Sequence, residues 1–259
     1  MTRTTRRLRL LVAHLRRVAT DERLRSAAVT HGRLDYPGAD IHLRLSSRQE
    51  FHRLSSCSKE PWTVRWIEDY LEPGDVLYDV GANVGAYTLL AAVAVPGMRV
   101  VSFEPSPANF AALCANVDLN GVSDRVIAVP LALGDRARSA LLDRDAAVPG
   151  GSPRLGNAVP AEAATKVLVD RLDDVIRRFD LPTPDHLKLD VEGGELDVLA
   201  GGERLLASGG VRSAMVELDR ERGSDVVDHL VSLGFELVER ASGRDRGPTM
   251  PTYGLFARA

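Results

Sequence analysis

Cysteines, aromatic residues and long apolar runs are all scarce in this chain of 259 residues. Its two cysteines, Cys57 and Cys114, have no metal-ligand spacing and cannot build a disulfide framework, which favours a reducing, cytoplasmic location. No apolar run is long enough to cross a bilayer, so no membrane span is expected. The net charge of -3 gives no general attraction to nucleic acid or to an acidic membrane. The hydrophobic fraction of 44% is that of an ordinary globular protein.

The first residues, MTRTTRRLRLLVAHLRR, are basic and partly amphipathic. Arg9 and His14 interrupt the apolar stretch that a signal peptide would need. We therefore expect a solvated or partner-packing helix here, within an N-terminal helical extension at residues 1–72. A single α/β domain is expected to follow at residues 73–259.

From residue 75 onward, apolar runs of strand length alternate with segments of helical periodicity. The predicted strands are residues 76–80, 99–103, 126–131, 166–169, 186–190, 211–218, 235–239 and 253–257. The predicted helices are residues 84–95, 107–119, 172–179, 194–207 and 225–233. This alternation predicts a mostly parallel sheet with helices on both faces.

The segment VLYDVGANVGAYTL at residues 76–89 has the pattern of a buried strand, a tight glycine turn and a helix. Glu104 closes the next apolar run. A doubly wound sheet holds a nucleoside with this arrangement, at the carboxyl ends of its first two strands. Gly81 and Gly85 would let the backbone approach a ligand closely, and Glu104 can accept hydrogen bonds from two ribose hydroxyls.

The turn also distinguishes between nucleoside cofactors. A dinucleotide fingerprint would have glycine where this chain has Asn83. Asp79 would repel a pyrophosphate, whereas its carboxylate suits the ammonium group of an amino acid. The pattern DxGxNxG therefore favours S-adenosylmethionine, and a nicotinamide-dependent dehydrogenase becomes a weaker alternative.

Further cofactor contacts are expected beside the turn. Pro105 and Ser106 follow Glu104 and should line the adenine pocket. Ala132 lies at the end of the third predicted strand and should border the adenine, although an apolar residue there could also belong to the core.

Six short blocks resemble, in order, the FkbM family of S-adenosylmethionine-dependent methyltransferases. They are DVGANVGAY from Asp79, FEPSPAN from Phe103, NVDLNG from Asn116, ALGD from Ala132, KLDVEGGE from Lys188 and VEL from Val216. The KLDVEGGE block is the most specific, although Gly194 stands where the family more often has alanine. The resemblance spans residues 61–218 and implies a class I methyltransferase fold, which has seven strands with the last one antiparallel. It also implies O-methylation, often on natural products or sugars.

An alcohol that accepts a methyl group must lose its proton, which calls for a general base. Four carboxylates are candidates, at or just after the ends of the fourth and fifth main strands: Asp190, Glu192, Glu195 and Glu217. Helix capping is the preferred role for Glu195, which leaves the other three. Helix capping is the alternative for Glu192, and Lys188 could neutralise Glu217. A divalent metal held by the three carboxylates is disfavoured, because no His or Asn lies at ligand spacing, so we expect no metal.

A stretch rich in Gly, Pro, Ala and Ser at residues 143–165 predicts a long loop. Its GGSPR segment, residues 150–154, would form a mobile lid over the acceptor. Arg154 could contact an acidic group of the acceptor, although a solvated arginine is the commoner case.

Together these features predict an S-adenosylmethionine-dependent O-methyltransferase that acts on a hydroxyl of a small metabolite, a natural product or a sugar. An RNA methyltransferase is the first alternative, disfavoured because aromatic residues make up only 5% of the chain and free positive charge gathers only at the N-terminus. A non-catalytic scaffold that binds the cofactor is the second alternative, and the three grouped carboxylates argue against it.

Overall fold

The computed structural model describes residues 30–143, 149–155, 164–242 and 252–258. The chain divides into two units, Met1–Thr30 and His31–Ala259, and all the elements below belong to the second. The basic helix predicted at the N-terminus lies outside the described residues. Among the residues that are described, no helix is long and apolar enough to cross a membrane.

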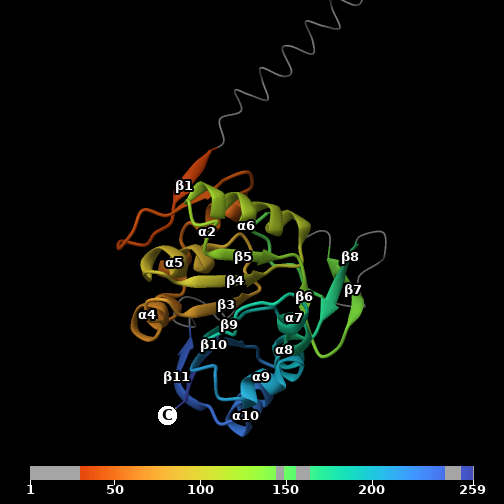
Figure 1. The fold of residues 1–259 in the computed structure, drawn as a ribbon. Coiled ribbons are helices and arrows are strands. Elements are labelled where there is room, and N and C mark those ends of the chain that lie inside the picture. The colour runs from red at the N-terminus through yellow and green to blue at the C-terminus, as the bar shows by residue number, and fades with distance from the viewer. Residues whose placement is uncertain (1–29, 144–148, 156–163, 243–251, 259) are drawn as a thin grey trace, which may run out of the picture. The chain divides into compact units, whose positions relative to one another are not determined.

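A seven-stranded sheet forms the centre of the second unit (Figure 1). Its order is β11-β12-β10-β9-β3-β4-β5. The strands are β3 (Val76–Val80), β4 (Arg99–Phe103), β5 (Val126–Val129), β9 (His186–Leu189), β10 (Ser213–Leu218), β11 (Glu236–Ser242) and β12 (Thr252–Ala257). Only β12 runs antiparallel to its neighbours β10 and β11, and the other described pairings in this sheet are parallel. The predicted mostly parallel sheet with an antiparallel last strand is confirmed.

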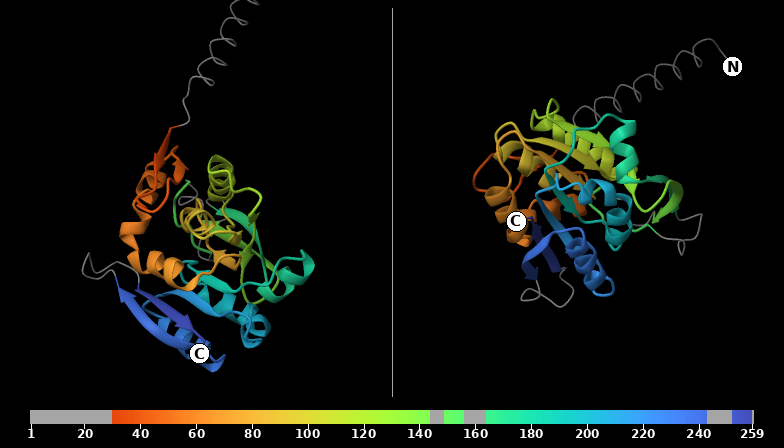
Figure 2. Two further views of the ribbon diagram at one scale, coloured as in Figure 1. Left: turned by 60° about the vertical axis from the view of Figure 1, so that its left-hand side comes forward. Right: turned by 60° about the horizontal axis from the view of Figure 1, so that its bottom comes forward.

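Helices cover both faces of this sheet (Figures 1 and 2). Successive side chains of a strand point to opposite faces, so Leu77 packs into one core and Tyr78 into the other. The first layer contains α4 (Pro61–Tyr70), α5 (Ala86–Ala94) and α6 (Pro107–Leu119); the second contains α7 (Leu172–Arg178), α8 (Glu195–Gly201), α9 (Glu203–Ala207) and α10 (Gly223–Ser232).

The strand order reverses between β3 and β9. After β3 the chain moves outward through β4 and β5, and it returns to the other side of β3 as β9. Open α/β sheets bind ligands at the carboxyl ends of their strands where such a reversal occurs. The fold therefore directs attention to the turn after β3 and to the residues after β9.

The segment before β3 packs onto the first helical layer. It contains β1 (His31–Arg33), β2 (His42–Arg44), α2 (Arg48–Arg53), α3 (Ser56–Lys59) and α4. Leu43 and Trp66 are almost fully buried and share one core with Leu90 of α5. The predicted boundary at residue 72 thus falls inside one packed unit, His31–Ala259.

A three-stranded sheet, ordered β6-β8-β7, extends from the main domain. It consists of β6 (Ala132–Leu133), β7 (Arg138–Asp143) and β8 (Ala164–Asp170). The sequence predicted neither β7 nor the break between β5 and β6. Pro130 separates these two strands, because proline has no N–H group to continue a ladder.

The single helix predicted at residues 194–207 is wrong, since the structure has two helices, α8 and α9. Gly201 and Gly202 at the junction have low helix propensity. The buried carboxylate of Asp173 accepts hydrogen bonds from the N–H groups of Arg204 at 3.1 Å and Leu205 at 2.9 Å. These otherwise unpaired groups lie at the start of α9, so Asp173 stabilises a new helix beginning there.

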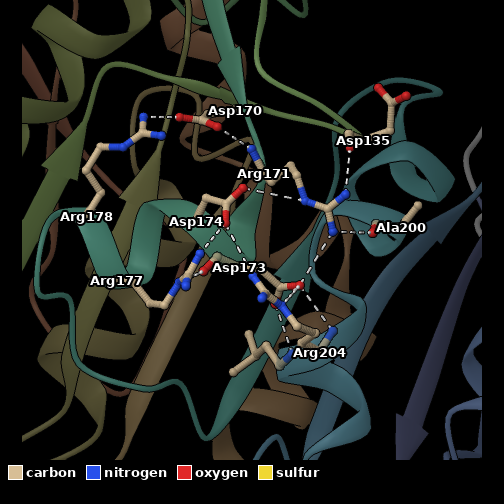
Figure 3. A network of polar contacts seen from close by, with 10 residues as sticks. Asp135, Asp170, Arg171, Asp173, Asp174, Arg177, Arg178, Ala200 and Arg204 are labelled. Carbon is tan, nitrogen blue, oxygen red and sulfur yellow. Dashed lines mark hydrogen bonds and ion pairs between the residues drawn. The ribbon is translucent and has the colours of Figure 1, made fainter.

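A network of aspartates and arginines joins these helices to the turn after β6 (Figure 3). Arg171 donates hydrogen bonds to the carbonyl oxygens of Asp135 at 3.1 Å and Ala200 at 3.4 Å. At the next residue after Ala200, a Cβ on Gly201 would lie 2.0 Å from the carbonyl oxygen of Gly134. The backbone of α8 therefore fixes the turn that follows Ala132.

We expect Gly201→Ala to lower the free energy of unfolding by about 1–3 kcal/mol, because the new methyl group overlaps a backbone oxygen that cannot easily move. Urea denaturation would measure the loss. Gly210→Ala is the control, since its nearest contact would be an ordinary 3.6 Å, and it should change stability little. Equal effects from the two substitutions would contradict this close packing.

Candidate functional site

A cavity of about 960 Å³ opens at the carboxyl ends of the central strands, within the size range of small-molecule sites. Eight of the eleven predicted site residues line it: Gly81, Asn83, Glu104, Pro105, Ala132, Asp190, Glu192 and Glu217. The other three, Asp79, Gly85 and Ser106, are not among its lining residues. The sheet therefore brings most of the predicted residues together.

The glycine turn passes extremely close to the chain after β9. Gly81 has a φ of +83°, and a Cβ at this position would lie 1.9 Å from the carbonyl oxygen of Asp190. The N–H groups of Gly81 and Ala82 both donate to the carbonyl of Phe103. Gly81 is thus required by the protein's own backbone. Gly85 adopts a left-handed conformation at the N-cap of α5, and its N–H donates to the carbonyl of Ala82.

Two cavity residues have an unfavourable backbone conformation. Asn83 has a φ of +54° and Glu192 a φ of +60°. Asparagine tolerates the left-handed region, but glutamate enters it at a cost. Such strain persists only where the surrounding structure enforces it, and it is commonest at functional sites.

Glu104 is a buried carboxyl at the edge of the cavity. Its two oxygens accept hydrogen bonds at 2.8 Å from the backbone N–H groups of Asn83 and Ser106. Burial raises the pKa of Glu104 to about 7, although these hydrogen bonds oppose the shift. Additional donors, such as ribose hydroxyls, would favour the ionised form. Ser106 therefore helps to orient Glu104 through its backbone N–H without lining the cavity itself.

Asp79 lies in the interior of the protein and pairs there with Lys188. Its Oδ2 accepts a 2.6 Å hydrogen bond from Thr88, and its Oδ1 lies 3.8 Å from the Lys188 ammonium. Burial raises the pKa of Asp79, and the charge of Lys188 opposes this. A direct contact between Asp79 and a cofactor ammonium stays a prediction, and the observed contact is with a lysine.

Asp190 accepts hydrogen bonds from two side chains at the cavity wall. Its Oδ2 accepts from the Lys188 ammonium and from the Tyr253 hydroxyl, both at 3.1 Å. Although burial opposes it, the charge of Lys188 holds the pKa of Asp190 below its usual range. Burial and the negative charge of Asp190 raise the pKa of Glu217 to about 10. These opposite shifts favour a charged Asp190 beside a protonated Glu217.

The family described as the methyltransferase FkbM domain matches residues 79–237 of this chain. The chain belongs to the FkbM methyltransferase family. The 31-O-demethyl-FK506 methyltransferase FkbM of Streptomyces tacrolimicus is 35% identical over 159 residues, which cover 51% of this chain and 61% of that relative. The hexuronic acid methyltransferase AglP of Haloferax volcanii is 29% identical over 186 residues, which cover 70% and 71% of the two chains. The match thus spans about three fifths of the first relative's length.

Among solved structures, magnesium protoporphyrin IX methyltransferase from Synechocystis PCC 6803, crystallised with bound S-adenosylmethionine, has a TM-score of 0.51. It shares 14% sequence identity with this chain, and the alignment covers 83% of this chain and 86% of the other. At this identity the likeness shows the fold, which is that of class I methyltransferases.

The sequence did not predict several residues that line this cavity. Tyr253 reaches Asp190 because the register of the antiparallel β12 places it opposite Glu217. Glu60 accepts a 2.8 Å hydrogen bond from the hydroxyl of Tyr87, whose ring lies 5.0 Å from the Lys188 ammonium. No local pattern reveals these partners, since they come from distant segments.

Hydrogen bonds hold residues 149–155, the described part of the predicted lid, against the cavity wall. The N–H of Gly150 donates to Asn109, and the carbonyl of Gly151 accepts from the side chains of Asn83 and Asn109. Arg154 lies 3.4 Å from Glu192. Residues 144–148 and 156–163 lie outside the described residues, so the mobility of a lid stays a prediction.

Asp190, Glu192 and Glu217 do not form a recognisable metal site. Within the parts of the chain that the structure describes, no three His, Cys, Asp or Glu side chains are grouped so that they could hold an ion. Lys188 and Tyr253 already donate to Asp190.

We expect Glu217→Gln to become increasingly more stable than the wild type as the pH rises. Above the ordinary pKa of 4.5, the unfolded chain releases the Glu217 proton whereas the folded protein retains it. The wild type therefore loses stability with rising pH at this residue, and the variant does not. Its amide can still donate to Asp190.

Urea denaturation from about pH 5 to about pH 9 would measure this difference. The exposed Glu236→Gln serves as the control and should follow the wild-type profile. A constant difference between Glu217→Gln and the wild type across this range would contradict a retained proton.

Proposed function

We propose that this FkbM-family protein is an S-adenosylmethionine-dependent O-methyltransferase that acts on a hydroxyl group of a small metabolite, such as a natural product or a sugar. The main support for this proposal is that one cavity contains both the buried Glu104 and the acid pair Asp190 and Glu217. The names of the two relatives, one acting on an FK506 derivative and one on a hexuronic acid, support an acceptor of this kind.

The cavity residues fit S-adenosylmethionine. Glu104 is held by two backbone N–H groups, so its remaining lone pairs can accept from ribose hydroxyls. Pro105 and Ala132 provide neighbouring surface for the adenine. When bound, S-adenosylmethionine supplies an electrophilic methyl group, and the protein's task is to position the acceptor and stabilise the developing charges.

Asp190 is the proposed base. A general base must be deprotonated before it can accept a proton, and Asp190 is the charged member of the acid pair. Lys188 and Tyr253 fix its carboxylate, while Glu217 donates to it in the neutral form. These donors also make Asp190 a weak base. A large part of its contribution to the rate therefore comes from orienting the acceptor hydroxyl.

Glu104→Ala should weaken the binding of S-adenosylhomocysteine roughly 10- to 100-fold, because it removes hydrogen bonds to a charged group. Isothermal titration calorimetry would measure this, with the exposed Glu203→Ala as a control of wild-type affinity. Binding of NAD in place of S-adenosylhomocysteine by the wild-type protein would refute the methyltransferase assignment.

Asp190→Asn should lower turnover about 100-fold or more while changing the affinity for S-adenosylhomocysteine much less. The assay follows S-adenosylhomocysteine formation with a panel of hydroxylated macrolides, sugars and uronic acids, and with RNA. Full activity of the variant would exclude Asp190 as the base. Methylation of the RNA alone would overturn the small-molecule assignment.

A further inference from the structure

Arg53 brings a positive charge to the cavity from outside the family-matched region. It is the last residue of α2 and lines the cavity wall. Its Nε donates to the carbonyl of Gly150 and its Nη2 to the hydroxyl of Ser152, both at 3.0 Å. Both partners are neutral, so neither compensates the charge of the guanidinium.

Six other basic side chains that line the cavity have carboxylate partners. The ion pairs are Lys59–Glu60, Arg136–Asp135, Arg138–Asp135, Arg154–Glu192, Lys188–Asp190 and Arg222–Asp197. No ion pair joins Arg53 to a carboxylate of the residues that the structure describes. Arg53 thus differs from these six in having no acidic partner.

The field of Arg53 reaches the acid pair. After Lys188 and Glu217, its positive charge also contributes to the lowered pKa of Asp190. No ion pair joins Arg53 to Asp190 among the described residues, and the Oδ2 of Asp190 accepts from Lys188 and Tyr253 instead. Arg53 therefore faces the proposed reaction site with unused donor capacity.

A guanidinium group is planar and presents paired N–H donors, a geometry that matches a carboxylate better than any neutral group. We propose that Arg53 binds a carboxylate group of a ligand in this cavity. The inference rests on the proposed function, which offers two sources of that group: the α-carboxylate of S-adenosylmethionine and an acidic group on the acceptor.

A purely structural role is the competing explanation, because both hydrogen bonds of Arg53 go to the segment at residues 149–155. Two substitutions separate the explanations. Ser152→Ala removes one of these hydrogen bonds and keeps the charge, whereas Arg53→Gln removes the charge. Arg48→Gln is the matched control, since Arg48 lies on the same helix, is exposed and does not line the cavity.

Calorimetry with three probes identifies the source of the carboxylate. S-adenosylhomocysteine carries the amino-acid group, and 5′-methylthioadenosine lacks it. Glucuronate, compared with glucose, is titrated into protein saturated with S-adenosylhomocysteine. If the cofactor supplies the carboxylate, Arg53→Gln weakens the binding of S-adenosylhomocysteine about tenfold or more and leaves the affinity for methylthioadenosine unchanged. If the acceptor supplies it, Arg53→Gln abolishes glucuronate binding alone.

The proposal is overturned if Arg53→Gln changes neither S-adenosylhomocysteine nor glucuronate binding. It is also overturned if Ser152→Ala reproduces the effect of Arg53→Gln, because the effect would then pass through the 149–155 segment. Failure of the wild-type protein to bind S-adenosylhomocysteine is a separate result, which refutes the proposed function itself. Thermal unfolding of each variant confirms that the compared proteins are folded.

Discussion

The buried ammonium of Lys188 is the charge on which the site depends. The register of β9 against β3 places Lys188 opposite Asp79, and its ammonium also contacts Asp190. Each of these ions would cost several kcal/mol to bury alone, and only their mutual attraction and hydrogen bonds make the arrangement tolerable. The lysine therefore connects Asp79 on β3 with Asp190, the residue that follows β9.

This connection makes the two halves of the site a single unit. Thr88 at the start of α5 holds Asp79, and Tyr253 on the antiparallel β12 holds Asp190. The carbonyl of Asp190 in turn fills the space beside Gly81. A displacement of the glycine turn would thus move the acid as well, which is how a rigid sheet can preserve the alignment that methyl transfer requires.

The sequence predicts those features that depend on local pattern. Strands 76–80 and 99–103 and helix 107–119 have the predicted bounds, since apolar runs and capping residues define them. Asp190 and Glu104 could be placed because strand ends of a parallel sheet gather at one edge. The break between α8 and α9 could not be predicted in this way, because it depends on a hydrogen bond from the start of α9 to Asp173, about 30 residues away in the sequence. Tyr253 depends in the same way on a register that no local pattern specifies.

The cavity combines residues from inside and outside the family match. The family match covers residues 79–237, which contain Glu104, Asp190 and Glu217. Arg53, Glu60 and Tyr253 lie outside it and yet line the same cavity. Part of the cavity wall is therefore built by segments outside the family match. The flanks are nevertheless coupled to the matched region, because Tyr253 donates to Asp190 and Glu60 accepts from Tyr87, whose ring lies 5.0 Å from the Lys188 ammonium.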